Sequence, residues 1–131
     1  MTDENRKRNA RDEAAIGEET LRAASALLGL GFPNDAVSRA YYAMVHFARA
    51  VLFLDGLQPK THRGVVSVLL DSRTPARLPR GAIDDLSRLQ TLRDVADYSL
   101  TRLTDEKAAS EVAAAERFIE AARAALAAAG V

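Results

Sequence analysis

The sequence predicts an all-α fold, an up-and-down bundle of about five helices with one short helix crossing it. Alanine, leucine, arginine and glutamate dominate the chain, and segments with the alternating pattern of a β-strand are missing. Apolar residues instead recur three and four positions apart, and glycines and prolines separate the segments with this pattern. With 131 residues, the chain is long enough for one domain with a sizeable core.

The N-terminal segment is crowded with charged residues and shows no apolar periodicity. We therefore expect residues 1–12 to be a charged, frayed N-terminus and residues 13–131 to form a single helical domain. The first helix should span about residues 11–30 and end near Gly29, because Pro33 prevents its continuation. The residues expected on its inner side are Ile16, Leu21, Ala24, Leu27 and Leu28.

The second predicted helix begins with Asn34 as its N-cap, runs to about Asp55 and stops at Gly56. It is apolar on nearly every side, which is typical of a buried, central helix. Four polar residues, spaced three or four apart, share one of its sides: Arg39, Tyr42, His46 and Arg49. Because a buried charge is costly without a partner, we expect this polar stripe to meet another helix, another subunit or an anionic ligand.

The remaining elements follow from caps and breakers. A short third helix should begin near Lys60 or Thr61, and residues 73–80, with two prolines and three arginines, should form a basic loop. A fourth helix is expected over about residues 82–99. Thr104, followed by two acidic residues, should cap the fifth, alanine-rich helix.

Composition excludes several classes of function. The 18 basic and 18 acidic side chains cancel, whereas a protein that coats nucleic acid needs a basic excess. Cysteine is absent, so there is no disulfide, thiolate metal site or cysteine nucleophile. The absence of long apolar runs and of a signal sequence predicts a cytoplasmic protein without a membrane partner. No phosphate-binding loop or metal-ligand motif occurs, so we expect no metal and no cofactor.

Four groups of residues are candidates for chemistry, and each has a structural alternative. The polar stripe of the second helix suits an anion, or else forms an interhelical seam in which Arg39 pairs with an acid such as Asp97. Residues 60–64 place Lys60, His62 and Arg63 at a helix N-terminus, which suits phosphate, or else form an exposed basic turn with Thr61 as the N-cap. Two weaker candidates are Arg93 with Asp97, which is equally an ordinary intrahelical ion pair, and the arginine loop, which is equally a solvated one.

Three motifs occur in order along the middle of the chain. They are Ser38-Arg39-Ala40-Tyr41-Tyr42-Ala43-Met44 followed by His46, Lys60-Thr61-His62-x-Gly64, and Arg93-x-x-Ala96-Asp97-Tyr98. Together they resemble the small stand-alone HEPN proteins (higher eukaryotes and prokaryotes nucleotide-binding domain). The resemblance implies a four- to five-helix bundle that forms a homodimer. It also implies a toxin–antitoxin pair in which the antitoxin partner is a minimal nucleotidyltransferase.

The resemblance further implies a metal-independent ribonuclease motif, Arg-x4-6-His. Arg93 matches the arginine of this motif, but Tyr98 stands where the histidine is expected, and a phenol is a poorer base than an imidazole at neutral pH. Arg39 and His46 also have this spacing, but on the second helix instead of the fourth. The residues expected to be catalytic are therefore Arg93, Tyr98 and His46.

Our leading interpretation is a HEPN module of toxin–antitoxin type that binds RNA phosphate or a nucleotide in a pocket between the second and fourth helices. The residues expected to bind this ligand are Arg39, Tyr42, Lys60, His62 and Asp97. One alternative is an active ribonuclease that leaves 2′,3′-cyclic phosphate ends, with His46 or His62 replacing the motif histidine. Another is a structural or interaction bundle without a ligand.

Overall fold

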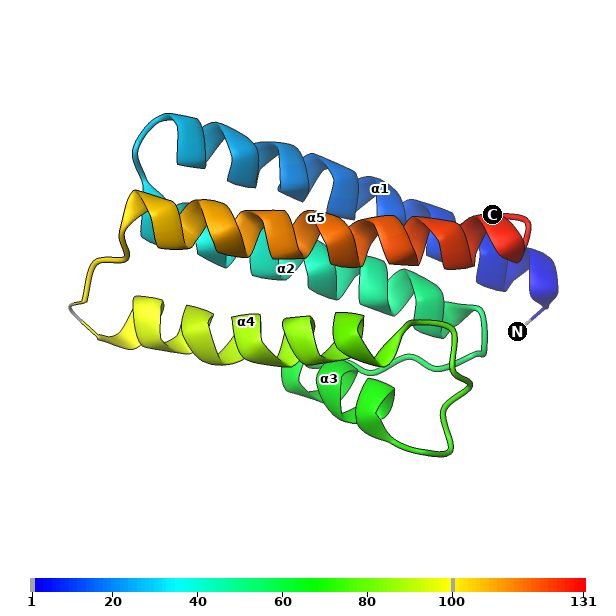
Figure 1. The fold of residues 1–131 in the computed structure, drawn as a ribbon. Helices are drawn as coiled ribbons and strands as arrows, with labels where there is room; N and C mark the ends of the chain where they lie inside the picture. The colour runs from blue at the N-terminus through cyan, green and yellow to red at the C-terminus, as the bar shows by residue number, and fades with distance from the viewer. Residues whose placement is uncertain (1, 100) are drawn as a thin grey trace.

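A computed structural model describes residues 2–99 and 101–131 of the protein. These residues form five helices and no strand: α1 (Asp3–Gly29), α2 (Pro33–Phe53), α3 (His62–Leu70), α4 (Arg80–Tyr98) and α5 (Asp105–Ala128). The four long helices run lengthwise with alternating direction, and the short α3 lies outside them beside α4 (Figure 1). The predicted all-α bundle is thus confirmed.

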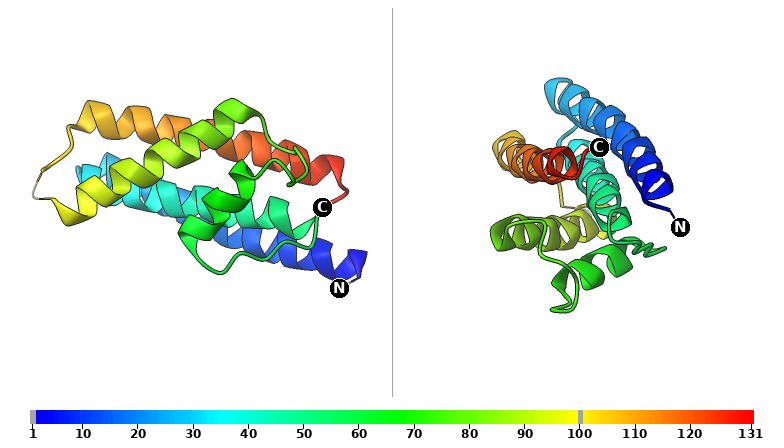
Figure 2. Two further views of the ribbon diagram at one scale, coloured as in Figure 1. Left: turned by 90° about the horizontal axis from the view of Figure 1, so that it is seen from below. Right: turned by 90° about the vertical axis from the view of Figure 1, so that its right-hand side faces the viewer.

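α2 is the central helix, as its apolar sequence predicted. It contacts all four other helices, and it lies in the middle when the bundle is viewed along its length (Figure 2). Thirteen of its 21 residues are buried, so little of this helix faces solvent. The largest fully buried side chains of the protein include Tyr41, Met44, Phe47 and Leu52 of α2 and Phe118 of α5.

α1 begins at Asp3, earlier than the predicted start near Arg11. Thr2 is its N-cap, because the Thr2 side chain accepts a hydrogen bond of 3.2 Å from the backbone N–H of Asn5. Asp3 and Glu4 place negative charge in the first turn, where the helix dipole favours it. The charged N-terminal segment therefore forms the first turns of α1.

Two cations of this early α1 segment lie beside the ends of other helices. The Arg6 guanidinium lies against Gly56, which follows α2, and the Lys7 ammonium lies close to Gly130, which follows α5. Neither α2 nor α5 has a basic residue in its own last turn. Helix C-termini favour positive charge. Through Arg6 and Lys7, α1 therefore supplies the positive charge that the last turns of α2 and α5 lack.

α1 and α2 pack closely at Gly17. Gly17 is buried, and a Cβ atom at this position would lie 2.7 Å from Cδ2 of the Phe47 ring. The glycine thus permits a close approach that any larger residue would prevent. The neighbouring Ile16, which we expected on the inner side, is 48% exposed, so this expectation is wrong. Adjacent helical residues point about 100° apart, and here the glycine takes the inner position.

Asn34 does not cap α2, contrary to our prediction. Phe32 is the N-cap and Pro33 occupies the first turn, a position that proline favours because it needs no N–H donor there. The Asn34 side chain instead donates to the carbonyl of Thr101 (3.1 Å) and accepts from the N–H of Leu103 (2.8 Å). It therefore fastens the α4–α5 connection to the start of α2.

Two other predicted helix caps are confirmed. Thr61 and Thr104 cap α3 and α5 as expected, each accepting a hydrogen bond from the backbone N–H three residues later.

The arginines of the loop and of the first turn of α4 each pair with an aspartate: Arg73 with Asp71, Arg77 with Asp55, and Arg80 with Asp84. This segment is therefore neutralised within the protein, which agrees with the structural alternative given above.

A buried acid joins α4 to α5. Glu111 is only 3% exposed, and its carboxylate accepts a hydrogen bond from Arg88 Nη1. Lys107 Nζ lies 3.6 Å from the other Glu111 oxygen, and Arg88 Nη2 donates to Asp85 at 2.9 Å. Glu111 is thus a buried charge that depends on its two cationic neighbours.

Candidate anion-binding site

Polar and aromatic side chains gather where α2, α3 and α4 meet. Tyr41 and Tyr42 come from α2, His62 is the first residue of α3, and Arg93 lies in the last third of α4. The Tyr42 and His62 ring centroids lie 4.8 Å apart, and those of Tyr41 and His62 lie 6.2 Å apart, both edge to face. Edge-to-face ring pairs stabilise a structure beyond the effect of burying the rings. These rings therefore hold the start of α3 against α2.

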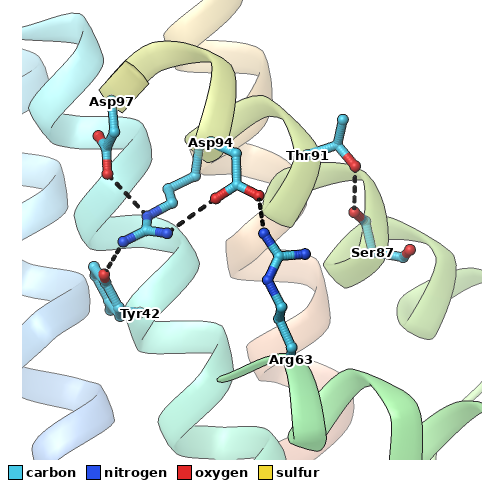
Figure 3. A network of polar contacts seen from close by, with 7 residues as sticks. Tyr42, Arg63, Ser87, Thr91, Asp94 and Asp97 are labelled. Carbon is cyan, nitrogen blue, oxygen red and sulfur yellow. Dashed lines mark hydrogen bonds and ion pairs between the residues drawn. The ribbon is translucent and has the colours of Figure 1, made fainter. Parts of the chain in front are cut away.

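Arg93 is the centre of this cluster, and its partners Tyr42, Asp94 and Asp97 are labelled in Figure 3. Its Nη2 donates a hydrogen bond to the Tyr42 hydroxyl, and its Nη1 donates to Asp94 Oδ1 at 3.0 Å. Nε lies 2.9 Å from Asp97 Oδ2, an ion pair outside hydrogen-bond geometry. The guanidinium carbon also lies 5.1 Å from the Tyr42 ring centroid. A side chain only 18% exposed is thus held from three directions.

The charge of Arg93 is secured by its neighbours. Burial acts to lower its pKa, but the hydrogen bond to Asp94 and the negative charges of Asp97 and Asp94 act to raise it, and the pKa is raised. Arg39, from α2, places its guanidinium carbon 5.4 Å from the opposing Tyr42 ring centroid and is itself exposed. Two cations from two helices therefore converge on one phenol ring.

Asp94 connects this cluster to α3. Its Oδ2 accepts a hydrogen bond of 2.8 Å from Nη2 of Arg63, while its Oδ1 accepts from Arg93 (Figure 3). One carboxylate thus bridges two arginines from different helices. The short N-terminal turn of α3, capped by Thr61, presents Arg63 to α4.

His62 differs from an ordinary histidine. Burial lowers its pKa, and the positive charges of Arg49 and Arg93 lower it further. The imidazole is therefore mainly neutral near pH 7 and is available as a proton acceptor.

Because the pKa of His62 is lowered on folding, the unfolded chain takes up this proton more readily as the pH falls. The contribution of His62 to stability should be complete above about pH 6.5 and be lost as the pH falls through the lower, folded pKa. Replacing His62 with glutamine should flatten this dependence. Urea denaturation from about pH 7.5 to pH 5 checks it; parallel stability curves for both proteins would contradict it.

Tyr41 is buried, at 1% exposure, and its hydroxyl has no hydrogen-bond partner within residues 2–99 and 101–131. Burial raises its pKa to about 12. Since an unpaired buried hydroxyl is costly, Tyr41→Phe should leave the free energy of unfolding unchanged or raise it by about 1 kcal/mol. Tyr42→Phe is the matched variant and should lower it, because Arg93 loses its acceptor. Thermal melts distinguish the two, and a clear loss in Tyr41→Phe would refute this account.

The structure brings together five of the predicted site residues: Arg39, Tyr42, His62, Arg93 and Asp97. Arg39 lies on the Tyr42 ring, and Asp97 pairs with Arg93, so the predicted pairing of Arg39 with Asp97 is wrong. Arg39 is also exposed, where we expected a buried stripe. The long Arg39 side chain extends into solvent, and Asp97 is already paired with Arg93.

The other predicted residues lie apart from this cluster. His46 Nδ1 lies 2.7 Å from Glu13 Oε1, and Arg49 Nη1 lies 3.9 Å from the same oxygen. The C-terminal half of the polar stripe therefore faces α1. The reason is that α2 is central, so the side chains along one of its sides meet two different helices, α4 and α1. Tyr98 is 80% exposed, and Lys60 is exposed in the turn before α3.

Our sequence prediction omitted two residues of the cluster, Tyr41 and Asp94. Arg63 belonged to the predicted basic site at the start of the third helix, and Asp94 directly follows the candidate Arg93. The ion pair between Arg63 of α3 and Asp94 of α4 gives no signal in a single sequence.

Within the described part of the chain, no group of three His, Asp or Glu side chains is arranged to hold a metal ion. None of the helices described here is both long and apolar enough to cross a membrane.

Comparison with known proteins decides the family. The model of the HEPN domain matches residues 10–125. The chain belongs to the HEPN family. This match includes all three helices that form the polar cluster, so the resemblance noted from the sequence is confirmed.

Several relatives of this HEPN protein come from archaea. A protein of Methanocaldococcus jannaschii, provisionally named as a toxin, is 36% identical over 110 residues, which cover 80% of this chain and 79% of the relative. A UPF0332 protein of Archaeoglobus fulgidus is 33% identical over 95 residues, which cover 72% and 76%. A UPF0332 protein of Pyrococcus horikoshii is 49% identical over 51 residues, which cover 39% and 36%.

Proposed function

We propose that this HEPN protein is the toxin-type member of a toxin–antitoxin pair, acts in the cytoplasm, and binds an RNA phosphate or a nucleotide where α2, α3 and α4 meet. One observation carries this proposal. Arg93 is a largely buried guanidinium that spans from α4 to Tyr42 of α2, beside the N-terminus of α3. The provisional naming of the M. jannaschii relative as a toxin supports the biological class.

Electrostatics favours an anionic ligand here. Three cations belong to the cluster, namely Arg39, Arg63 and Arg93, against two acids, Asp94 and Asp97, and the exposed Lys60 lies in the turn before α3. The backbone N–H groups at the start of α3 add positive potential. Arginine forks suit phosphate oxygens, and the exposed Arg39 and Lys60 are free to approach a ligand from solvent.

RNA binding is tested by fluorescence anisotropy with a short single-stranded RNA. Arg39→Gln should weaken binding about tenfold, because Arg39 is exposed and its loss removes one phosphate contact. Arg117→Gln is the matched control, since Arg117 is exposed on α5, away from the cluster. Absence of binding by the unchanged protein, or equal weakening by both variants, would contradict the proposal and favour a purely structural seam.

The biological pairing needs separate experiments. Expression of the protein alone should arrest growth, and co-expression of a minimal nucleotidyltransferase encoded beside it should relieve the arrest. The two proteins should co-purify. Light scattering should give the mass of a homodimer for the protein alone, as the family implies. A harmless protein that co-purifies with no such partner would refute this part of the proposal.

A second candidate function is metal-independent cleavage of RNA. The specific observation is His62, whose lowered pKa keeps it neutral beside the phosphate-binding cation Arg93. In this reaction a neutral imidazole accepts the proton of the 2′-hydroxyl, whose oxygen attacks the phosphorus. The bond from phosphorus to the 5′-oxygen breaks, the 5′-oxygen takes up a proton from water, and arginine offsets the phosphate charge. RNA incubated with the protein in EDTA should yield 2′,3′-cyclic phosphate ends. His62→Gln should abolish cleavage, and His46→Gln should not, since His46 faces Glu13. Intact RNA after incubation with the unchanged protein removes this candidate.

A further inference from the structure

The bridge formed by Asp94 has the geometry of an occupied phosphate site. Arg63 Nη2 donates to one Asp94 oxygen at 2.8 Å, and Arg93 Nη1 donates to the other at 3.0 Å. Two arginines from different elements that converge on one anion are a common way to hold phosphate. Here the anion is an internal carboxylate.

The two arginines differ in how firmly they are held. The Arg63 side chain is 76% exposed, so its ion pair with Asp94 is a surface contact that contributes little to stability. Arg93 is only 18% exposed and keeps Tyr42 and Asp97 as partners without Asp94. Release of Asp94 would therefore free Arg63 at low cost and leave Arg93 in its place.

Charge decides which ligand displaces the carboxylate. An internal phosphodiester of RNA carries one negative charge, the same as Asp94, so the exchange gains nothing and Asp94 remains nearby to repel the ligand. A terminal phosphate monoester carries about 1.5 to 2 negative charges at pH 7 and offers three acceptor oxygens. Only the terminal phosphate brings more charge to the two arginines than Asp94 already supplies.

We infer that Arg63 and Arg93 form a subsite for a terminal phosphate monoester, and that Asp94 occupies this subsite in the free protein and selects against internal phosphodiesters. The inference rests on the proposed function and narrows its ligand to a phosphorylated RNA end or a nucleoside monophosphate. Both ligands present the same phosphate group to the subsite. Asp94 is therefore a residue that determines specificity.

Binding of three probes tests the inference by isothermal titration: a short RNA with a 5′-phosphate, the same RNA with a 5′-hydroxyl, and adenosine monophosphate. The unchanged protein should bind the phosphorylated RNA about tenfold more tightly than the hydroxyl form. This preference should weaken from pH 7 to about pH 5, as the phosphate loses its second charge. Adenosine monophosphate binding as tightly as the phosphorylated RNA identifies a nucleotide as the ligand; weaker binding identifies an RNA end.

Variants separate the role of Asp94 from a general effect on binding. Asp94→Asn should tighten binding of the hydroxyl RNA and reduce the preference to about twofold or less. Arg63→Gln should also lose the preference, whereas Arg73→Gln, an exposed arginine paired with Asp71, should keep it. Urea denaturation of each variant confirms that it folds.

Three results would overturn the inference. Equal binding of both RNAs, lost in Arg39→Gln, would remove the phosphate subsite but leave the proposed function intact. An unchanged preference in Asp94→Asn would show that Asp94 selects nothing. Absence of binding to all three probes would overturn the proposed function itself, and the inference with it.

Discussion

Replacing Arg93 with alanine should abolish RNA or nucleotide binding and lower the free energy of unfolding by about 2–3 kcal/mol. The substitution removes the hydrogen bonds to Tyr42 and Asp94 and the ion pair to Asp97, and it uncovers the Tyr42 ring. It leaves two neighbouring carboxylates without their shared cation. Of these contacts, the hydrogen bond to Tyr42 and the contact with the Tyr42 ring join α4 to α2.

Arg93→Lys is the matched variant, because it keeps the charge but lacks the planar fork that reaches three partners. It should retain part of the stability and lose most of the binding. Urea denaturation and RNA anisotropy on the same samples measure both quantities. A protein with Arg93→Ala that unfolds at the unchanged urea concentration and still binds RNA would contradict the central role given to this residue.

Replacing Arg88 with alanine should destabilise the protein by about 3 kcal/mol, although Arg88 itself is half exposed. The cost arises at Glu111, which is almost fully buried and would keep only Lys107, 3.6 Å away. A buried carboxylate that loses its closest cation must remain charged at a high cost or take up a proton.

The double variant Arg88→Ala/Glu111→Leu tests this explanation. Leucine has no charge to compensate, so the double variant should recover most of the stability lost in Arg88→Ala. Glu111→Leu alone should cost less than Arg88→Ala. Chemical denaturation of the four proteins gives the coupling energy between the two positions. An additive double variant would show that Arg88 acts through Asp85 and not through Glu111.

Local rules predicted most of the fold. Thr61 and Thr104 cap α3 and α5 because a hydroxyl before a helix satisfies an N–H in its first turn, and this requires only neighbouring residues. The apolar circumference of α2 likewise predicted its central place. Asn34 was assigned wrongly because the same side chain that can cap a helix also bonds well to a distant loop, and residues 101 and 103 are the distant partners.

The candidate site was predicted only in part, for a related reason. Helical spacing placed Arg39, Tyr42 and His46 on one side of α2, but spacing does not say where one neighbouring helix ends and the next begins. The boundary falls between Tyr42, which meets α4, and His46, which meets Glu13 of α1. The bridge from Arg63 to Asp94 depends on how α3 lies against α4, and only the three-dimensional arrangement reveals it.

The positions of Arg6 and Lys7 have a consequence for how the protein assembles. Both residues are synthesised before α5, and Lys7 meets its neighbour Gly130 only after α5 has been made. Contacts between residues so far apart in the chain form late, since closing the long intervening loop costs entropy. We therefore expect the part of α1 around Lys7 to become fully protected from proteases during synthesis only when α5 docks.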